Sequence, residues 1–288
     1  MTIAFFNGTF LDADKKVIPI DERGHQFGDG VYEVIRVYGG KPFLMREHLL
    51  RLERSADAIQ LKGNYTVSEL EQIILEGLTK SQLQEAEVYI QVTRGISPRQ
   101  HLFPDVPAST SMTIRPARTI SETARKDGVA VLLMEDERWA NCYVKSLNLL
   151  PNILAKQNAV SQGFYEAIFH RDGVITEGSS CNIFAVKNGA LHTPQATKRI
   201  LHGITRANVL AIANELEIPV KEEDITIGFL MESDEVFITS TTMEILPVRS
   251  LSSENGNQVA FGAPGPITKR LHERYQSQFL ANQQRTGE

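Results

Sequence analysis

The sequence contains little cysteine and no long run of apolar residues. Cys142 and Cys181 are the only cysteines among 288 residues, and their spacing fits no metal or redox motif. Such low cysteine use is typical of a reducing compartment. No apolar stretch approaches the ~20 residues that span a bilayer. Residues 1–16 also lack the basic and apolar regions of a signal peptide. We therefore expect a cytoplasmic protein without a membrane segment.

A strong excess of either charge is also absent, as are several common motifs. The 35 acidic and 30 basic residues give a net charge of −5, which argues against a general binder of nucleic acid. The P-loop, the Rossmann glycine motif, the HExxH zinc motif and the EF-hand loop do not occur, and the histidines show no metal-ligand spacing. These absences disfavour nucleotide hydrolysis, Rossmann redox chemistry and zinc proteolysis, and we expect no metal.

The composition that is present is that of a globular protein, with 42% hydrophobic and 23% charged residues. At roughly 150 residues per domain, the length favours two domains. Strand-like and helical patterns occur in separate runs, which favours an α+β fold over a doubly wound sheet. The polar segment 119–128 lacks apolar periodicity. We interpret it as a linker between an N-terminal α+β domain, residues 1–118, and a C-terminal α+β domain, residues 129–288.

Local patterns predict several hairpins and helices. Tight two-residue turns are predicted at four dipeptides between strand-like runs: Asn7 and Gly8, Gly39 and Gly40, Asp172 and Gly173, Asn188 and Gly189. Apolar residues at helical spacing predict helices over residues 47–61, 152–162, 204–218 and 267–280. Thr66 and Glu69 have the spacing of a capping box before a further helix.

Six longer blocks of sequence follow one another between about residues 20 and 250. They are RGHQFGDGVYEVIRVYGGKPF, VTRGISPRQHLFP, WANCYVKSLNLLPNILAKQ, YEAIFHRDGVITEGSSCNIF, LHGITR and TSTTMEILPV. In this order they resemble the class IV (fold-type IV) pyridoxal-phosphate aminotransferases, and most of all the D-amino-acid aminotransferases among them. Several long motifs in order are far more specific than one short pattern. The resemblance implies the two-domain fold-type IV architecture, with the cofactor-binding lysine in the C-terminal domain.

The resemblance implies pyridoxal 5′-phosphate as cofactor and assigns residues to it. Lys145 resembles the lysine that forms an aldimine with the cofactor aldehyde and then moves the substrate α-proton. Glu177 resembles the carboxylate that keeps the pyridine nitrogen protonated, so that the ring can act as an electron sink. Each residue alone also fits an ordinary role, a surface lysine and a solvated turn glutamate. The six blocks together favour the catalytic interpretation.

Further residues are implied around the phosphate and the ring. Arg51 resembles the family's phosphate arginine, because a guanidinium binds phosphate through two parallel hydrogen bonds. A predicted helix N-terminus and a second turn resemble the phosphate site, because helix N-termini supply backbone donors; these residues are Ile204, Thr205, Ser240 and Thr241. The remaining implied cofactor contacts are Leu201, Ser179 and Ser180. The ordinary alternatives are a solvated helix face for Arg51, a plain N-cap for Thr205 and core packing for Leu201.

The substrate is implied by the block RGISPRQHLFP. Arg99 and His101, together with Tyr32, resemble the carboxylate-binding residues of D-amino-acid aminotransferases. An arginine and a tyrosine hydroxyl can hold an α-carboxylate in one orientation, and this decides which α-hydrogen points at Lys145. The alternative is a solvated basic loop. One departure from the family pattern is Cys181, which stands where a third serine is expected.

We therefore expect ping-pong transamination of D-amino acids, with D-alanine and 2-oxoglutarate giving pyruvate and D-glutamate. The alternatives are a branched-chain L-amino-acid or R-amine aminotransferase of the same class, an aminodeoxychorismate lyase, and a silent cofactor-binding protein. The resemblance also implies a homodimer in which the loop of Arg99 and His101 completes the neighbour's site. Beyond small amino and oxo acids we expect no nucleic-acid or membrane partner.

Overall fold

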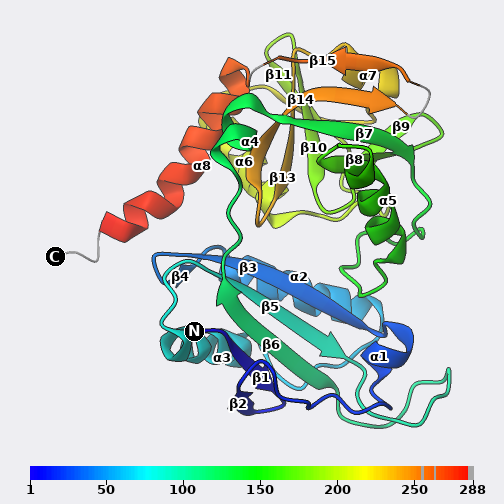
Figure 1. The fold of residues 1–288 in the computed structure, drawn as a ribbon, viewed down its shortest axis with the longest axis vertical. Helices are drawn as coiled ribbons and strands as arrows, with labels where there is room; N and C mark the ends of the chain where they lie inside the picture. The colour runs from blue at the N-terminus through cyan, green and yellow to red at the C-terminus, as the bar shows by residue number, and fades with distance from the viewer. Residues whose placement is uncertain (254–255, 263, 285–288) are drawn as a thin grey trace. The chain divides into compact units, whose positions relative to one another are not determined.

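The computed structural model describes residues 1–253, 256–262 and 264–284. They group into two compact units (Figure 1). The first unit contains residues 1–118 and 144–148, and the second contains residues 119–143 and those from 149 onward. Each unit is a sheet with helices packed on it, which confirms the α+β class. None of the described helices is both long and apolar enough to cross a membrane.

The first unit is built on an antiparallel six-stranded sheet in the order β2-β1-β6-β5-β3-β4. Its strands are β1 Ile3–Phe6, β2 Thr9–Leu11, β3 Gly30–Tyr38, β4 Lys41–Pro42, β5 Ala86–Thr93 and β6 Ser109–Pro116. Successive side chains of a strand point to opposite faces of the sheet. In β3, Val31 and Ile35 are fully buried, whereas Tyr32 on the other face is only half-buried.

Three helices belong to the first unit: α1 Arg23–Phe27, α2 Met45–Ala58 and α3 Val67–Ser81. Helix α2 packs on β3, and α3 packs on β1 and β6. Their apolar residues, such as Leu49 and Ile74, are fully buried against the sheet. The predicted capping box is confirmed, because Thr66 Oγ1 accepts from Glu69 N and the Glu69 carboxylate accepts from Thr66 N.

The second unit is built on a nine-stranded sheet in the order β12-β11-β10-β13-β14-β7-β8-β9, with β15 paired to β14. Most neighbours are antiparallel, but β7 runs parallel to both β14 and β8. The strands are β7 Val129–Glu135, β8 Glu166–Arg171, β9 Val174–Gly178, β10 Asn182–Lys187, β11 Ala190–Thr193, β12 Val220–Glu222, β13 Glu235–Ser240, β14 Glu244–Ser253 and β15 Gln258–Ala260.

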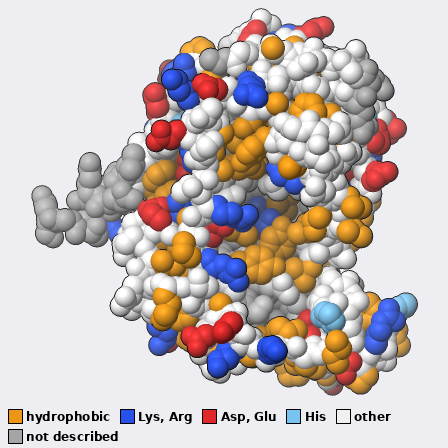
Figure 2. Space-filling view, viewed as in Figure 1, with side chains coloured by type: hydrophobic (Ala, Val, Ile, Leu, Met, Phe, Trp, Pro, Cys, Tyr) orange, Lys and Arg blue, Asp and Glu red, His pale blue; other side chains and the backbone are white. Residues whose placement is uncertain are grey.

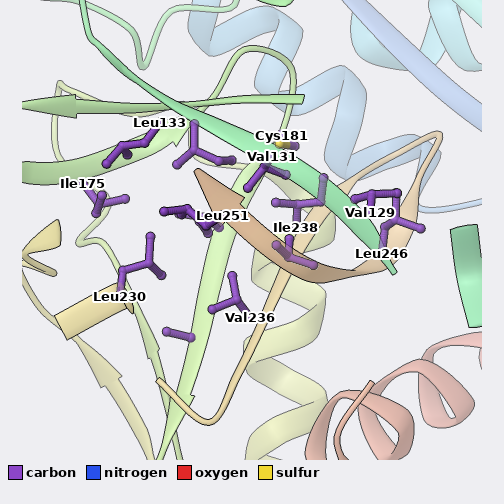
Figure 3. Packing of buried hydrophobic residues seen from close by; sticks show 14 of the residues in the cluster. Val129, Val131, Leu133, Ile175, Cys181, Leu230, Val236, Ile238, Leu246 and Leu251 are labelled. Carbon is purple, nitrogen blue, oxygen red and sulfur yellow. The ribbon is translucent and has the colours of Figure 1, made fainter. Parts of the chain in front are cut away.

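The main core of the second unit lies against this sheet. Figure 3 shows side chains from several strands meeting there, among them Val131, Ile238 and Leu251. Cys181 belongs to the same cluster and is buried. Burial raises the pKa of its thiol well above the usual value. The cysteine at this position is therefore part of the apolar core.

The helices of the second unit are α4 Glu122–Asp127, α5 Leu150–Ser161, α6 Ile204–Glu215, α7 Ile227–Met231 and α8 Pro266–Gln284. The inner face predicted for the helix over 204–218 is confirmed, since Val209, Ile212 and Ala213 of α6 are fully buried. Helix α4 lies in the segment interpreted as a linker. Ser121 caps it by accepting a hydrogen bond from Ala124 N, a local signal that apolar periodicity does not detect.

The four predicted hairpin turns are confirmed. They connect β1 to β2, β3 to β4, β8 to β9 and β10 to β11. Both residues of each dipeptide have positive φ, between 42° and 93°, which is the left-handed backbone of such turns. Glycine and asparagine adopt this backbone at the least steric cost, so these local sequences determine where the chain reverses.

Candidate active site

Lys145 lies in the short segment 144–148, which groups with the first unit. Ser146 forms an antiparallel bridge with Val31, and Tyr32 N donates to Lys145 O over 3.0 Å. The N–H of Lys145 donates to Ser55 Oγ on α2 over 3.2 Å. These bonds attach the segment to β3 and α2, so Lys145 lies with the first unit and not in the body of the predicted C-terminal domain.

The amine of Lys145 lies over an aromatic ring. Its Nζ is 4.4 Å from the ring centroid of Tyr32, and that ring stacks on Tyr89. Within the described residues no carboxylate forms an ion pair with this amine. The structure therefore brings together Lys145 and Tyr32, two residues that the sequence pattern assigned to the site, and leaves the amine available to a ligand.

A buried charged cluster lies beside this segment on α2 and β3. Arg51 Nε and Nη2 donate to the two carboxylate oxygens of Glu33, over 2.6 and 2.9 Å, and His48 Nδ1 lies 2.8 Å from Glu33 Oε2. Burial would raise the pKa of Glu33, but Arg51 and His48 outweigh it and hold the pKa well below its usual value. Burial lowers the pKa of His48, although Glu33 opposes this change.

Arg51, the predicted phosphate residue, is thus held by Glu33, a residue that sequence reasoning missed. A signal for Glu33 exists in the strand pattern. It stands between Val31 and Ile35 with the same alternation, so it faces the helices as a buried carboxylate that needs a partner. The pair orients Arg51 rigidly, and a guanidinium carries five N–H donors.

Arg99 and His101 lie in the loop between β5 and β6, and both are exposed. The guanidinium of Arg99 lies 4.7 Å from the ring centroid of Phe27, and the His101 ring packs edge-on against the same ring. Neither side chain forms an ion pair with the described residues. Within the chain the structure thus brings Arg99 and His101 together, at Phe27.

Glu177 lies in the second unit at the end of β9 and is buried. Its carboxylate accepts from Arg138 Nη1 over 2.6 Å, from Asn182 Nδ2 over 3.0 Å and from the N–H of Leu201 over 3.0 Å. Arg138 in turn binds Asp136 through Nε and Nη2. Leu201, predicted as a ring contact, therefore reaches the predicted carboxylate through its backbone.

The charges around Glu177 are balanced by burial and pairing. Burial raises the pKa of Glu177, while Arg138 and the N–H of Leu201 act in the opposite direction. Burial acts against the charge on Arg138, but Glu177 and Asp136 outweigh it and raise its pKa. Sequence reasoning missed Arg138 and Asp136. Their signal is a pair of opposite charges two residues apart, directly after a buried strand.

Ser179 and Ser180 donate their hydroxyl hydrogens to the buried carboxylate of Glu166. Lys156 Nζ lies 3.1 Å from the same carboxylate, and Ser179 O accepts from Asn152 Nδ2 over 2.8 Å. The side chains of the two predicted cofactor serines therefore stabilise the turn between β9 and β10. What remains for a ligand at this turn is mainly its backbone.

Ile204 and Thr205 form the first turn of α6, and Gly203 is its N-cap. No side chain of the described residues caps this helix, so its first N–H groups point toward a ligand. A Cβ added to Gly203 would lie 2.0 Å from Asn182 Oδ1, so the cap must be glycine. An uncapped helix N-terminus is a suitable site for a phosphate.

Ser240 and Thr241 lie where β13 turns into β14, and α6 packs against β13. Ser240 Oγ accepts from Met243 N over 3.2 Å, which shapes the turn. The hydroxyl of Thr239 is buried and has no hydrogen-bond partner in the described structure. The second half of the predicted phosphate site thus also presents hydroxyl and backbone donors.

These groups fit pyridoxal phosphate in their chemistry. The first unit offers the amine of Lys145, which can bond to an aldehyde. The second unit offers the buried carboxylate of Glu177 and an uncapped helix N-terminus for the phosphate. A carboxylate has about four lone-pair positions, and the three donors on Glu177 leave one for a pyridinium N–H.

The fold and these groups together define a pyridoxal-phosphate enzyme of α+β architecture. Residues 30–251 match the family model described as amino-transferase class IV, and the chain belongs to this family. The family predicted from the six blocks, its fold type, its cofactor and the aminotransferase class are confirmed.

One curated relative is the D-alanine aminotransferase of Staphylococcus haemolyticus, which is 42% identical over 275 residues, covering 95% of this chain and 96% of the relative. Among solved structures, the branched-chain aminotransferase of Thermoproteus uzoniensis with norvaline is similar, with a TM-score of 0.87, 28% identity and coverage of 98% and 96% of the two chains. Another solved structure, a branched-chain amino acid aminotransferase with pyridoxamine 5′-phosphate from the organism abbreviated T.th., has a TM-score of 0.86, 26% identity and coverage of 96% and 93%.

Proposed function

We propose that the protein is a D-amino-acid aminotransferase that uses D-alanine and 2-oxoglutarate and releases pyruvate and D-glutamate. The likeness to the Staphylococcus haemolyticus D-alanine aminotransferase, which extends over almost the whole of both chains, carries this proposal. The presence of Arg99 and His101 in the β5–β6 loop supports the D-amino-acid branch. The two half-reactions alternate on one site in ping-pong fashion.

Lys145 is the residue that acts on the substrate. When bound, the cofactor supplies an electron sink for the electrons released at the substrate α-carbon. Lys145 Nζ holds the cofactor through its aldehyde carbon and, once the substrate has displaced it, carries the α-proton. Tyr32 lies under this amine and orients it.

The remaining cofactor contacts come from residues with rigid positions. Glu177 places a negative charge at the pyridine nitrogen, and Arg138 and Asn182 hold that carboxylate in place. The phosphate is bound by backbone and hydroxyl donors and by one guanidinium: Arg51, Ile204, Thr205, Ser240 and Thr241. The ring and the turn beside it contact Leu201, Ser179 and Ser180.

The α-carboxylate of the substrate is bound by Tyr32, Arg99 and His101. A guanidinium binds a carboxylate through two parallel hydrogen bonds, which orients it as well as attracting it. Holding the carboxylate on one side determines which α-hydrogen faces Lys145, and this selects the D enantiomer.

A homodimer completes this arrangement, with the loop of Arg99 and His101 shared with the neighbouring copy. Both side chains are exposed and contact Phe27, whereas the Tyr32 ring contacts Tyr89. Helix α5 also exposes Leu150, Ile153 and Leu154, each by more than half, and Figure 2 shows hydrophobic side chains at this part of the surface. Two copies of the chain cover such a face. A fully active monomer in light scattering would contradict this dimer.

The protein acts in the cytoplasm on small amino and oxo acids. Cys142 and Cys181 are both free thiols, as a reducing compartment requires. The domains of the enzyme are those predicted from the sequence, 1–118 and 129–288, with segment 144–148 attached to the first.

The test is an absorption spectrum of the purified, cofactor-loaded protein before and after D-alanine or L-leucine, without an acceptor. We expect D-alanine alone to convert the yellow form to the pyridoxamine form. Conversion by L-leucine alone would instead indicate the branched-chain activity named for the two solved structures. No conversion by either would contradict both and leave an amine donor, the lyase or a silent binder.

A further inference from the structure

We propose that Asp29, together with Arg23 and Arg94, is a positioning residue that holds the loop 97–104 in its substrate-binding conformation. The proposal rests on the proposed role of Arg99 and His101, which this loop carries. The three charged residues lie outside the loop, and their side chains are largely buried. They bind its backbone and one of its side chains, and not the substrate itself.

Arg23 on α1 attaches the tip of the loop. Its guanidinium donates from Nη1 to the carbonyl oxygens of Gln100 and Leu102, over 2.6 and 3.5 Å. These two residues flank His101 and follow Arg99. The side chain of Arg23 is 3% exposed, so water does not compete for these bonds. One guanidinium thus determines the backbone conformation at both proposed carboxylate-binding residues.

Arg94 attaches the loop from the other end. Its guanidinium carbon lies 3.7 Å from the ring centroid of Phe103, an exposed aromatic residue in the loop. Nη1 and Nη2 donate to the carbonyl oxygens of Gln60 and Ile59 at the end of α2, each over 2.8 Å. Arg94 therefore connects Phe103 to a helix that does not move with the loop.

Asp29 couples the two arginines. Its Oδ2 accepts from Arg23 Nε and from Arg94 Nε, each over 2.9 Å. Without this carboxylate, two buried guanidinium groups would lie side by side with no negative charge between them, and they would repel each other. The main chain reinforces the arrangement, because Arg94 N donates to Asp29 O over 3.1 Å.

The reason for such an anchor is the chemistry of the loop. Arg99 and His101 are exposed, and their contacts with Phe27 alone do not define an orientation for a carboxylate ligand. Binding a carboxylate with fixed handedness requires that the loop lose little conformational freedom on binding. The buried Asp29 cluster supplies that order before the substrate arrives.

The experiment compares the cofactor-loaded Asp29→Asn variant with the parent protein. We expect KM for D-alanine to rise roughly tenfold, the loss of one charge-assisted hydrogen-bonded pair, while kcat changes less. Hydrogen exchange of the backbone amides of residues 97–104, followed by mass spectrometry, should become roughly tenfold faster. Exchange in α3 should not change, because that helix lies outside the cluster.

Phe103→Leu provides a second variant that keeps the buried charges and therefore folds. It removes the ring under Arg94, and we expect faster exchange in residues 97–104 with a smaller rise in KM. Glu71→Gln is the matched control. It removes a carboxylate paired with Arg46, whose side chain is mostly exposed, and should change neither quantity.

Unchanged exchange in Asp29→Asn and Phe103→Leu would overturn the proposal, as would faster exchange with unchanged KM. The role of Arg99 itself is tested separately with Arg99→Leu. An unchanged KM in that variant would contradict the carboxylate role, and the exchange rates of Asp29→Asn would then decide the anchoring alone.

Discussion

Arg138 Nη1 donates to Glu177 Oε1 over 2.6 Å, and the same guanidinium binds Asp136 through two further nitrogens. The carboxylate proposed to face the pyridine nitrogen is therefore one end of a buried chain of alternating charges. Arg171 extends the chain, with Nη2 3.4 Å from Asp136 Oδ2. Such a chain keeps Glu177 charged at a place where burial alone would favour the neutral acid.

The first prediction concerns this guanidinium. Arg138→Gln removes the strongest partner of Glu177, so burial raises the pKa of that carboxyl further and weakens its hold on a pyridinium. We expect kcat/KM to fall about 10- to 100-fold, the loss of a hydrogen bond to a charged group. Cofactor affinity should fall as well, measured on the apoprotein by quenching of the fluorescence of Trp139, the single tryptophan.

Arg138→Lys separates charge from hydrogen-bond geometry. A lysine keeps the positive charge but cannot serve Asp136 and Glu177 together, so we expect partial recovery. Parent-like affinity and activity in Arg138→Gln would show that Glu177 does not depend on this partner.

The second prediction concerns Lys145. Lys145→Ala should lose covalent attachment of the cofactor, and turnover should fall roughly 100- to 10,000-fold because the proton carrier is gone. Borohydride reduction followed by mass spectrometry checks the attachment. Lys62→Ala, at an exposed position, is the control and should retain the adduct. An adduct that persists in the Lys145 variant would assign the cofactor to another lysine.

The third prediction concerns the N-cap of α6. Gly203→Ala places a Cβ against Asn182 Oδ1, and Asn182 also binds Glu177 and Leu201 O. We expect the free energy of unfolding to fall by about 1–3 kcal/mol and cofactor affinity to weaken. Thermal unfolding and Trp139 quenching measure the two effects.

Gly228→Ala provides the matched control for this cap. A Cβ at Gly228 meets nothing within 4 Å, so the variant should be neutral or stabilised by up to about 1 kcal/mol. Equal stability of the Gly203 and Gly228 variants would mean that Asn182 moves away at no cost.

The fourth prediction concerns pH. The pKa of Glu33 is lower in the folded protein than its ordinary value of 4.5, so its pairing with Arg51 stabilises the fold above that pH. This contribution is lost as pH falls toward the folded-state pKa. Glu33→Gln leaves Arg51 buried without its partner and should cost about 3–5 kcal/mol at pH 7. The difference from the parent protein should shrink below pH 4.5, as measured by urea unfolding at pH 7 and pH 4. A difference that does not depend on pH would contradict the ionic role of Glu33.

Much of the local structure could be predicted, because it depends on residues a few positions apart. The paired positive-φ residues at Asn188 and Gly189 determine a reversal by themselves, and so does the capping box of Thr66 and Glu69. The short helix α4 was interpreted as linker, because it has no buried face from which periodicity could detect it. The order of the six motifs was sufficient to predict the family.

The partners of the site residues could not be predicted. Glu33 and Arg51 are 18 residues apart, Arg138 and Glu177 are 39 apart, and Arg23 and Gln100 are 77 apart. Such contacts depend on which strands become neighbours and on which side of a helix faces the sheet. No local pattern contains that information, although a charged residue at an inward strand position shows that a partner must exist.

The sequence by itself thus determined the residue types of the chemistry, namely an amine, a carboxylate, hydroxyls and a glycine at a helix start, together with their order along the chain. Only the tertiary structure decided that Lys145 lies with the first unit beside Tyr32, and that Arg138 holds Glu177. The physical reason is that turns and caps are local equilibria of the backbone. Buried charge pairs form only when packing removes both partners from water and leaves each with the other.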